Sequence, residues 1–293
     1  MKFPPFDYLA PADLDEAIEA LTVDEDAKVL AGGQSLLPLM ALRLARPSVV
    51  VDLGRLDVAP AAIDPGPGPA GTLRLGALTR QAVLEEDAAV GSAAPLVAAA
   101  VRHVGHRATR ALGTIGGSLA HADPAAELPA VMVALEASVV TRSPRGTRTI
   151  PCATLASGFF TTCLDHDEVI IEVHVPAAAA GTGSAWCEWA ARSGDFAEAG
   201  VGVNLEPGDD GSCAKARAAA SGVAPTPVDL SSIVSPLLTG VNTAGPSVLR
   251  EIAAAVAAEC VSELAGLLAA RAVHRAMAAM GRGSERTGSG AAA

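Results

Sequence analysis

The first third of the chain alternates short apolar segments with a helical pattern. Residues 14–21 (LDEAIEAL) place apolar side chains at helical spacing after Asp13, a candidate N-cap, and predict a helix. Residues 27–32 and 48–53 are short, rich in Val and Leu, and predict strands. The segment 36–44 between them predicts a helical turn. We therefore expect strands and helices to alternate in this region.

The middle of the chain changes from helical to strand patterns. Residues 80–104 predict helical structure that is interrupted near Gly91 and Pro95. A helix, a two-strand hairpin and a strand of alternating polarity are predicted next, at residues 125–135, 137–151 and 168–176. This mixture favours an α+β or mixed α/β fold.

The pattern changes again near Thr182. Three further strands are predicted, at residues 184–193, 198–206 and 214–223. An Ala-rich helical region follows from Leu249 to Met280. We therefore place a domain boundary near residue 178, which divides the chain into an N-terminal domain, a smaller C-terminal domain of sheet and helices, and a disordered tail, at residues 1–177, 178–281 and 282–293.

Composition and charge exclude several classes of function. The 293-residue chain is 50% hydrophobic but only 3% aromatic, so its core must consist mainly of Ala, Val and Leu. The net charge of −11 argues against a nucleic-acid partner, because binding to phosphates requires clustered Lys and Arg. The sequence has no signal-peptide pattern and no uncharged window of the ~20 residues that cross a bilayer. We expect a cytoplasmic protein without a transmembrane segment.

The cysteines and histidines show no spacing that is typical of a metal site. Five cysteines stand at positions 152, 163, 187, 213 and 260 without a CxxC pair, so any iron–sulfur cluster is expected on another chain. Among the six histidines only His103 and His106 are close in sequence, at a predicted helix end. We predict no metal site there.

Residues 66–71 (GPGPAG) formally match the dinucleotide-binding fingerprint GxGxxG. That fingerprint needs a helix directly after the glycines, whose amides point at a pyrophosphate. Here Pro67 and Pro69 remove amides, and residues 72–78 predict a strand. The segment 64–71 is therefore predicted to be a loop between two strands.

Residues 116–120 (GGSLA) approach the GxSxG nucleophile elbow of hydrolases, and His121 follows directly. A hydrolase requires a strand before Ser118, and an acid and a histidine within reach of the serine. The residues before the serine are only a weak strand candidate, although His166 or His174 could serve as the base. The hydrolase hypothesis therefore stays open on the sequence.

Two glycine motifs form a more specific pattern. The first glycine motif is AGGQS at residues 31–35, and the second glycine motif is TIGGS at residues 114–118. Glycine lets a backbone approach a ligand closely, and a serine hydroxyl can donate to an anion. The pair predicts either two halves of a site for a phosphate-rich ligand or two ordinary glycine turns.

Four segments carry a resemblance to a known family: FDYLAPADLDEAIEAL, AGGQSLLPLM, LGTIGGSLAHADPAAELP and GDFAEAGVGV. In this order and at these separations they resemble the FAD-binding medium subunit of the molybdenum hydroxylases, of the carbon monoxide dehydrogenase type. The resemblance runs from about Phe6 to Met280. It implies a two-domain flavoprotein whose N-terminal domain binds FAD non-covalently.

The resemblance also implies which residues bind the cofactor. The first motif would wrap the pyrophosphate with main-chain amides, the second would complete the site, and acidic, apolar and aromatic side chains would follow near the flavin. The residues concerned are Ala31, Gly32, Gly33, Gln34, Ser35, Thr114, Ile115, Gly116, Gly117, Ser118, Glu127, Ile170 and Phe196. No side chain is expected to act as a catalytic acid or base, because the flavin carries the chemistry.

Several positions depart from the family's pattern. Ser118, Glu127 and Phe196 stand where the family usually has Asn, Asp and, in the carbon monoxide dehydrogenase type, Tyr. Glu188 falls in a strand where relatives have lysines, and a carboxylate there would oppose negative charge on a reduced flavin. Arg192 could substitute for the missing cation. The C-terminal region also lacks the loop and the Tyr-Arg pair that usually precede the last helix.

The function that the resemblance implies is electron transfer. In the family, a large subunit with a molybdopterin cofactor oxidises the substrate, and a small subunit with two [2Fe-2S] clusters relays the electrons. FAD on the medium subunit then passes them to a terminal acceptor. Two alternatives stay open: a stand-alone flavin-dependent oxidoreductase derived from such a subunit, and a flavin-free hydrolase or scaffold.

Overall fold

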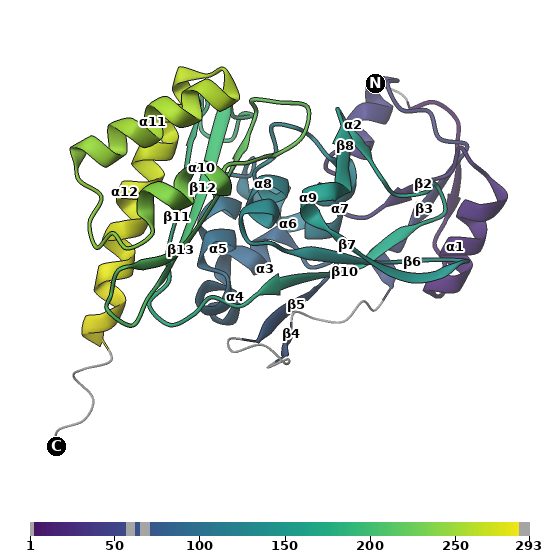
Figure 1. Cartoon of the computed structure of the whole chain (residues 1–293). Coiled ribbons are helices and arrows are strands. Elements are labelled where there is room, and N and C mark those ends of the chain that lie inside the picture. Colours follow the sequence, from purple (N-terminus) through teal and green to yellow (C-terminus); the bar gives the residue numbers. More distant parts are fainter. Residues whose placement is uncertain (1–2, 57–61, 65–70, 287–293) are drawn as a thin grey trace.

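The N-terminal region is a small parallel sheet flanked by helices (Figure 1). The computed structural model describes residues 3–56, 62–64 and 71–286. The first sheet has the strand order β1-β3-β2, and each neighbouring pair is parallel. The elements of this region are β1 (Asp7–Leu9), α1 (Leu14–Val23), β2 (Lys28–Leu30), α2 (Leu36–Ala41), β3 (Val49–Asp52) and the 3-10 helix η1 (Leu53–Arg55). The predicted alternation of strands and helices is confirmed.

Helix α1 is stabilised by an N-terminal cap and by an apolar face. Asp13 Oδ1 accepts a hydrogen bond from the Glu16 amide at 2.9 Å, which satisfies one free donor of the first turn. Ile18 and Leu21 lie on the buried face and pack with Val51 of β3. The helical spacing of these apolar residues therefore predicted the face that packs on the sheet.

A five-stranded antiparallel sheet forms the middle of the molecule (Figure 1). Strand β10 lies at its centre, between β5 and β6, and β6 and β7 form the predicted hairpin. In sheet order the strands are β4 (Ala62–Asp64), β5 (Thr72–Gly76), β10 (Val169–Pro176), β6 (Ser138–Ser143) and β7 (Gly146–Pro151). Residues 65–70, with nearly all of the GPGPAG match, lie outside the described residues. The strands on either side of them, β4 and β5, are paired antiparallel.

Short helices and a small hairpin accompany this sheet. They are α3 (Gln81–Glu86), α4 (Ala88–Ala93), α5 (Pro95–Val101), α6 (Arg107–Leu112), α7 (Ile115–His121), α8 (Glu127–Ala134), α9 (Cys152–Leu155), β8 (Ala156–Gly158) and β9 (Thr161–Thr162). Side chains of α5 and α8 share one apolar core with those of β5 and β10, among them Leu96, Val131, Leu75 and Val173. Helix α7 also contacts β10.

The helical region differs from its prediction in two places. The predicted break at Gly91 is wrong, because Gly91 lies inside α4 and the chain turns at Asp87 instead. Asp87 Oδ1 accepts from the amides of Ala89 and Val90 at 2.7 and 3.2 Å, so its side chain starts a new helix. The predicted break at Pro95 is confirmed, because Pro95 begins α5.

The C-terminal region is an antiparallel sheet covered by helices (Figure 1). Its elements are β11 (Gly183–Trp189), β12 (Ala199–Pro207), β13 (Cys213–Ser221), β14 (Val228–Asp229), α10 (Ser231–Leu238), α11 (Pro246–Cys260) and α12 (Glu263–Arg286). The three predicted strands are confirmed. The predicted helical tail is two helices, separated at Val261, whose φ of 50° ends α11 in the left-handed region. Helix α12 continues beyond Met280 to Arg286, into the segment predicted as a tail.

The two predicted domains share apolar contacts. Trp186 of β11 and Ala219 of β13 belong to the core cluster that contains the side chains of α5 and α8. The C-terminal sheet thus packs directly on the N-terminal part, and the boundary near residue 178 stays a prediction. Within the described residues, no helix is long and apolar enough to cross a membrane.

Candidate functional site

The first glycine motif lies at the carboxyl end of the parallel sheet. Strand β2 ends at Leu30, the motif occupies residues 31–35, and α2 begins at Leu36. Ligands of open α/β sheets bind at this edge, where loops leave the strands. Gly33 has a φ of 71°, in the region that favours glycine, so the sharp exit from the strand depends on this residue.

The main-chain amides of the first glycine motif are available to a ligand. Within the described part of the chain, no acceptor pairs with the amides of Gly32, Gly33, Gln34 and Ser35. The whole motif is partly exposed, and the Gln34 side chain folds back to donate to the Gly32 carbonyl at 3.2 Å. Successive free amides in one turn form a concave site for anions. The motif therefore has the donors that a phosphate group needs.

The second glycine motif is the start of a helix and not an ordinary glycine turn, which was one of the two alternatives left open by the sequence. Thr114 caps α7, and its Oγ1 accepts from the Gly117 amide at 3.1 Å. The Ile115 amide donates to the Thr79 carbonyl at 3.1 Å, and the Gly116 amide donates to the Ala77 carbonyl at 2.8 Å. These three amides are already used, so the second motif anchors α7 to the segment that follows β5.

The two glycine motifs touch each other, as the two-halves hypothesis requires. A Cβ on Gly32 would overlap the Leu112 carbonyl oxygen and lie 2.7 Å from the Gly113 Cα. A Cβ on Gly117 would lie 3.6 Å from the Cβ of Ala31. Packing within the protein thus also requires two of these glycines: Gly32 lies against residues 112–113, and a Cβ on Gly117 would lie 2.8 Å from Thr114 Oγ1.

The serines of the two motifs offer further donors. Ser35 and Ser118 are partly exposed, and within the described chain neither hydroxyl has a hydrogen-bond partner. Ser118 lies in α7 and is preceded by helix α6, whereas a nucleophile elbow needs a strand before the serine. His121 lies on the same helix, its ring 5.2 Å from that of Phe160, and burial lowers its pKa. The elbow required by the hydrolase hypothesis is absent at Ser118.

Glu127 begins α8, one short loop after the second glycine motif. It is only 6% exposed, and burial raises the pKa of its carboxyl group to about 7, with a further contribution from Glu188. Helix α8 contacts α7, the helix that the second motif begins. A carboxyl group with this pKa can either donate or accept a hydrogen bond near neutral pH.

The Glu188 carboxylate has two polar partners. Its Oε1 lies 3.1 Å from His103 Nδ1, and its Oε2 accepts from the Trp186 indole at 2.7 Å. The hydrogen bond to Glu188 raises the pKa of His103 above its usual value. Arg192, the expected substitute for the missing cation, has no ion pair within the described chain. The partner of Glu188 is thus His103, a pairing that the sequence did not reveal.

The two side chains expected near the flavin ring lie in different environments. Phe196 is 75% exposed, in the loop between β11 and β12. The same loop lies against the segment after α5, because a Cβ on Gly194 would overlap the ring of His106. Ile170 is buried in the core of the central sheet. Phe196 is thus exposed, whereas Ile170 belongs to the apolar core.

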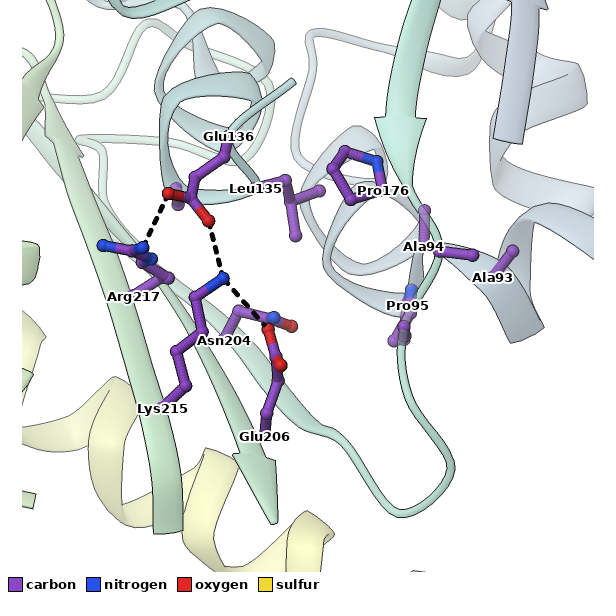
Figure 2. A pocket seen from close by; sticks show the side chains of 13 residues that line it. Ala93, Ala94, Pro95, Leu135, Glu136, Pro176, Asn204, Glu206, Lys215 and Arg217 are labelled. Atoms are coloured by element: carbon purple, nitrogen blue, oxygen red, sulfur yellow. Dashed lines mark hydrogen bonds and ion pairs between the residues drawn. The ribbon is translucent and has the colours of Figure 1, made fainter. Parts of the chain in front are cut away.

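A pocket elsewhere in the molecule is lined in part by side chains that form ion pairs with one another (Figure 2). It lies between the end of α8 and strands β12 and β13. Glu136 pairs with Lys215 and Arg217, at 2.6 Å each, and Lys215 also lies 3.6 Å from Glu206. No predicted cofactor residue lines this pocket, so it is separate from the glycine motifs. In the described part of the chain, no group of three or more His, Cys, Asp or Glu could hold a metal ion.

Comparisons with known proteins place the chain in a family. Residues 4–178 match the family described as FAD binding domain in molybdopterin dehydrogenase. The nicotine 6-hydroxylase medium subunit of Paenarthrobacter nicotinovorans is 43% identical over 209 residues, 71% of this chain and 72% of that protein. The carbon monoxide dehydrogenase medium chain of Hydrogenophaga pseudoflava is 37% identical, over 76% of each chain.

A solved structure agrees with this assignment. The carbon monoxide dehydrogenase of Hydrogenophaga pseudoflava that lacks the Mo-pyranopterin moiety superposes with a TM-score of 0.88 at 34% identity. The match covers 95% of this chain and 99% of that chain, so it includes the C-terminal sheet and helices. The fold is therefore the two-domain flavoprotein fold that the resemblance implied. The chain belongs to the family of FAD-binding medium subunits of the molybdenum hydroxylases.

Proposed function

We propose that the first glycine motif holds the diphosphate of FAD and that the second glycine motif supports it from behind. The single observation that carries this proposal is the row of amides at residues 32–35, which have no acceptor among the residues that the structure describes, next to a helix start whose amides are already paired. A diphosphate needs several donors at hydrogen-bond distance, and a glycine backbone can supply them without a side chain in the way.

The remaining predicted residues complete this site. The free Ser118 hydroxyl would donate to the cofactor, and Thr114 keeps α7 in place by capping it. The Glu127 carboxyl group would hydrogen-bond a polar group of FAD, while Phe196 would cover the ring from the β11–β12 loop. When bound, FAD supplies a redox couple that exchanges electrons in pairs or singly. The protein's part is to bind and orient it.

We further propose that this chain acts within a complex. Several relatives are named as medium subunits or medium chains, which fits a large subunit with molybdopterin and a small subunit with [2Fe-2S] clusters as partners. Electrons would pass from the clusters through FAD to a terminal acceptor. No cysteine of this chain is spaced for cluster binding, which supports the division of labour. We predict that the complex is cytoplasmic.

Purification of the chain together with its partners tests the proposal. The chain is produced with the genes that neighbour its own, purified, and examined by absorbance between 300 and 600 nm. We expect the absorption of oxidised flavin and, after denaturation, about one released FAD per chain. A colourless protein that takes up no FAD when the cofactor is offered would contradict the proposal. A yellow chain that purifies without large and small partners would instead support the stand-alone oxidoreductase.

A further inference from the structure

Arg80 brings a positive charge to the place where the two glycine motifs meet. It lies directly before α3, and its Nη1 donates a hydrogen bond to the carbonyl group of Leu112, the last residue of α6. The oxygen of this carbonyl is also the atom that a Cβ on Gly32 would overlap. One carbonyl group therefore joins the guanidinium of Arg80 to the first glycine motif.

The backbone of Arg80 is attached to the second glycine motif. Arg80 and Thr114 form an isolated β-bridge. The amide of the next residue, Gln81, donates to the Gly113 carbonyl at 2.9 Å. These contacts fix the Cα of Arg80 beside the second motif, so its side chain reaches toward the first motif from a defined position.

A structural role accounts for only part of the Arg80 side chain. The last carbonyl groups of a helix lack partners within that helix, and a basic side chain can hydrogen-bond them. A guanidinium has several N–H donors in a planar fork, however, and the bond to Leu112 uses only Nη1. Within the residues that the structure describes, Arg80 has no ion pair with a carboxylate. A partly exposed cation with unused donors thus lies close to Gly32, where the row of free amides begins.

Main-chain amides and a guanidinium complement each other at a phosphate site. Amides supply dipoles but no net charge, whereas each phosphate of a diphosphate carries negative charge at neutral pH. The parallel N–H groups of a guanidinium match two phosphate oxygens, and the group stays charged throughout the physiological pH range. The chain as a whole has a net charge of −11, which repels an anionic ligand. A cation next to the amides would offset this repulsion where the ligand binds.

We propose that Arg80 forms an ion pair with the diphosphate of FAD, and that its hydrogen bond to the Leu112 carbonyl aims the guanidinium at the first glycine motif. This inference rests on the proposed function and adds to it a cofactor-binding residue outside both motifs. The donors that Leu112 leaves free make the contact with the phosphate oxygens.

The salt dependence of FAD binding is the direct test. The complex, or the chain if it purifies alone, is depleted of FAD and titrated with FAD at about 50 and about 500 mM potassium chloride, which differ about threefold in screening length. We expect the dissociation constant of the unmodified protein to rise severalfold with salt, because salt screens a partly exposed ion pair. Arg80→Gln should bind FAD about tenfold or more weakly at low salt, with a smaller rise at high salt.

Two further variants separate charge from structure. Arg80→Lys keeps the positive charge but loses the planar fork, so it should retain most of the salt dependence with an intermediate affinity. Arg250→Gln is the matched control, because it removes the same charge from an exposed position on α11, at the opposite end of the molecule from β2 (Figure 1). It should bind FAD like the unmodified protein at both salt concentrations. The melting temperature of each variant measures what the bond to Leu112 contributes to stability.

The outcomes distinguish this inference from the proposed function. An Arg80→Gln variant with the affinity of the unmodified protein would overturn the ion pair but leave the proposed function intact. The same follows if this variant binds FAD weakly and keeps the full salt dependence, because Arg80 then acts only as a cap of α6. If Arg80→Gln does not fold, the unmodified protein still decides, since a dissociation constant that does not change with salt overturns the inference. Failure of the unmodified protein to bind FAD at either salt concentration contradicts the proposed function itself.

Discussion

The two glycine motifs look alike in sequence but differ in the structure. The first is partly exposed, and its four amides at residues 32–35 have no partner in the described chain. The second is mostly buried, and the amides of Ile115, Gly116 and Gly117 are all paired within the protein. The amides of the first motif are therefore open to a ligand, whereas those of the second serve the protein's own packing, although Gly32 of the first motif also packs closely against residues 112–113.

Because of this difference, substitutions in the two motifs should affect stability and FAD binding differently. A side chain added to the second motif should disturb the fold first and lose the cofactor as a consequence. A side chain added at Gly33 of the first motif, where the nearest atoms belong to flexible side chains, should remove the cofactor from a protein that is still folded. Stability and FAD content, measured on the same variants, therefore test the comparison directly.

Gly116→Val should have the largest effect on stability. A Cβ there would lie 2.6 Å from the Cβ of Ala77 and 2.8 Å from its carbonyl oxygen, so α7 would have to move away from the central sheet. We expect a loss of about 3 kcal/mol in the free energy of unfolding, as for overpacking in a buried site. Urea unfolding measures it. Gly91→Val is the control, because a Cβ on Gly91 would have no atom within 4 Å. The free energy of unfolding of this variant should hardly change.

Gly33→Val should remove FAD at a smaller cost in stability. The residue has a φ of 71°, and a valine there costs about 1–2 kcal/mol of backbone strain. Its side chain would also disturb the row of free amides, so we expect FAD content after purification to fall close to zero. Gly211→Val carries the same strain at a φ of 79° in an open loop. If this control loses FAD equally, strain alone explains the result and the first motif is not the site.

Thr114→Ala should reveal the supporting role of the second motif. The substitution removes the cap of α7, which costs about 1 kcal/mol. Because the Thr114 hydroxyl is used within the protein, the affinity for FAD should change less than the melting temperature does. A variant with unchanged stability and a large loss of affinity would show that Thr114 contacts the cofactor directly.

Periodicity predicted the larger elements well. The helix that begins at Leu14 and the hairpin of β6 and β7 depend on apolar spacing and turns that are local in sequence. Helix α6 was missed, because a six-residue helix without a buried residue has no apolar face to recognise. The break at Asp87 was also missed, because it depends on a side-chain cap rather than on Gly91.

The candidate site was predictable only in part. The glycine motifs were found from the sequence, since adjacent glycines before a serine are visible there. Their different roles were not visible, because they depend on carbonyl groups of Ala77 and Thr79, about 35 residues before the second motif. The pairing of His103 with Glu188 was hidden for the same reason, although the two-residue spacing of Trp186 and Glu188 could have indicated a donor for that carboxylate.

Ser118→Ala is expected to have the smallest effect and sharpens the comparison most. Ser118 belongs to the second motif, yet its hydroxyl is partly exposed and unpartnered in the described chain, like the amides of the first motif. Loss of one hydrogen bond to FAD should cost about 0.5–1.5 kcal/mol, or roughly a two- to tenfold weaker affinity, with no change in melting temperature. Titration of FAD-depleted protein measures it, with Ser247→Ala, at the exposed start of α11, as the control. An unchanged affinity would mean that the second motif is purely a support, and that the first motif alone binds the diphosphate.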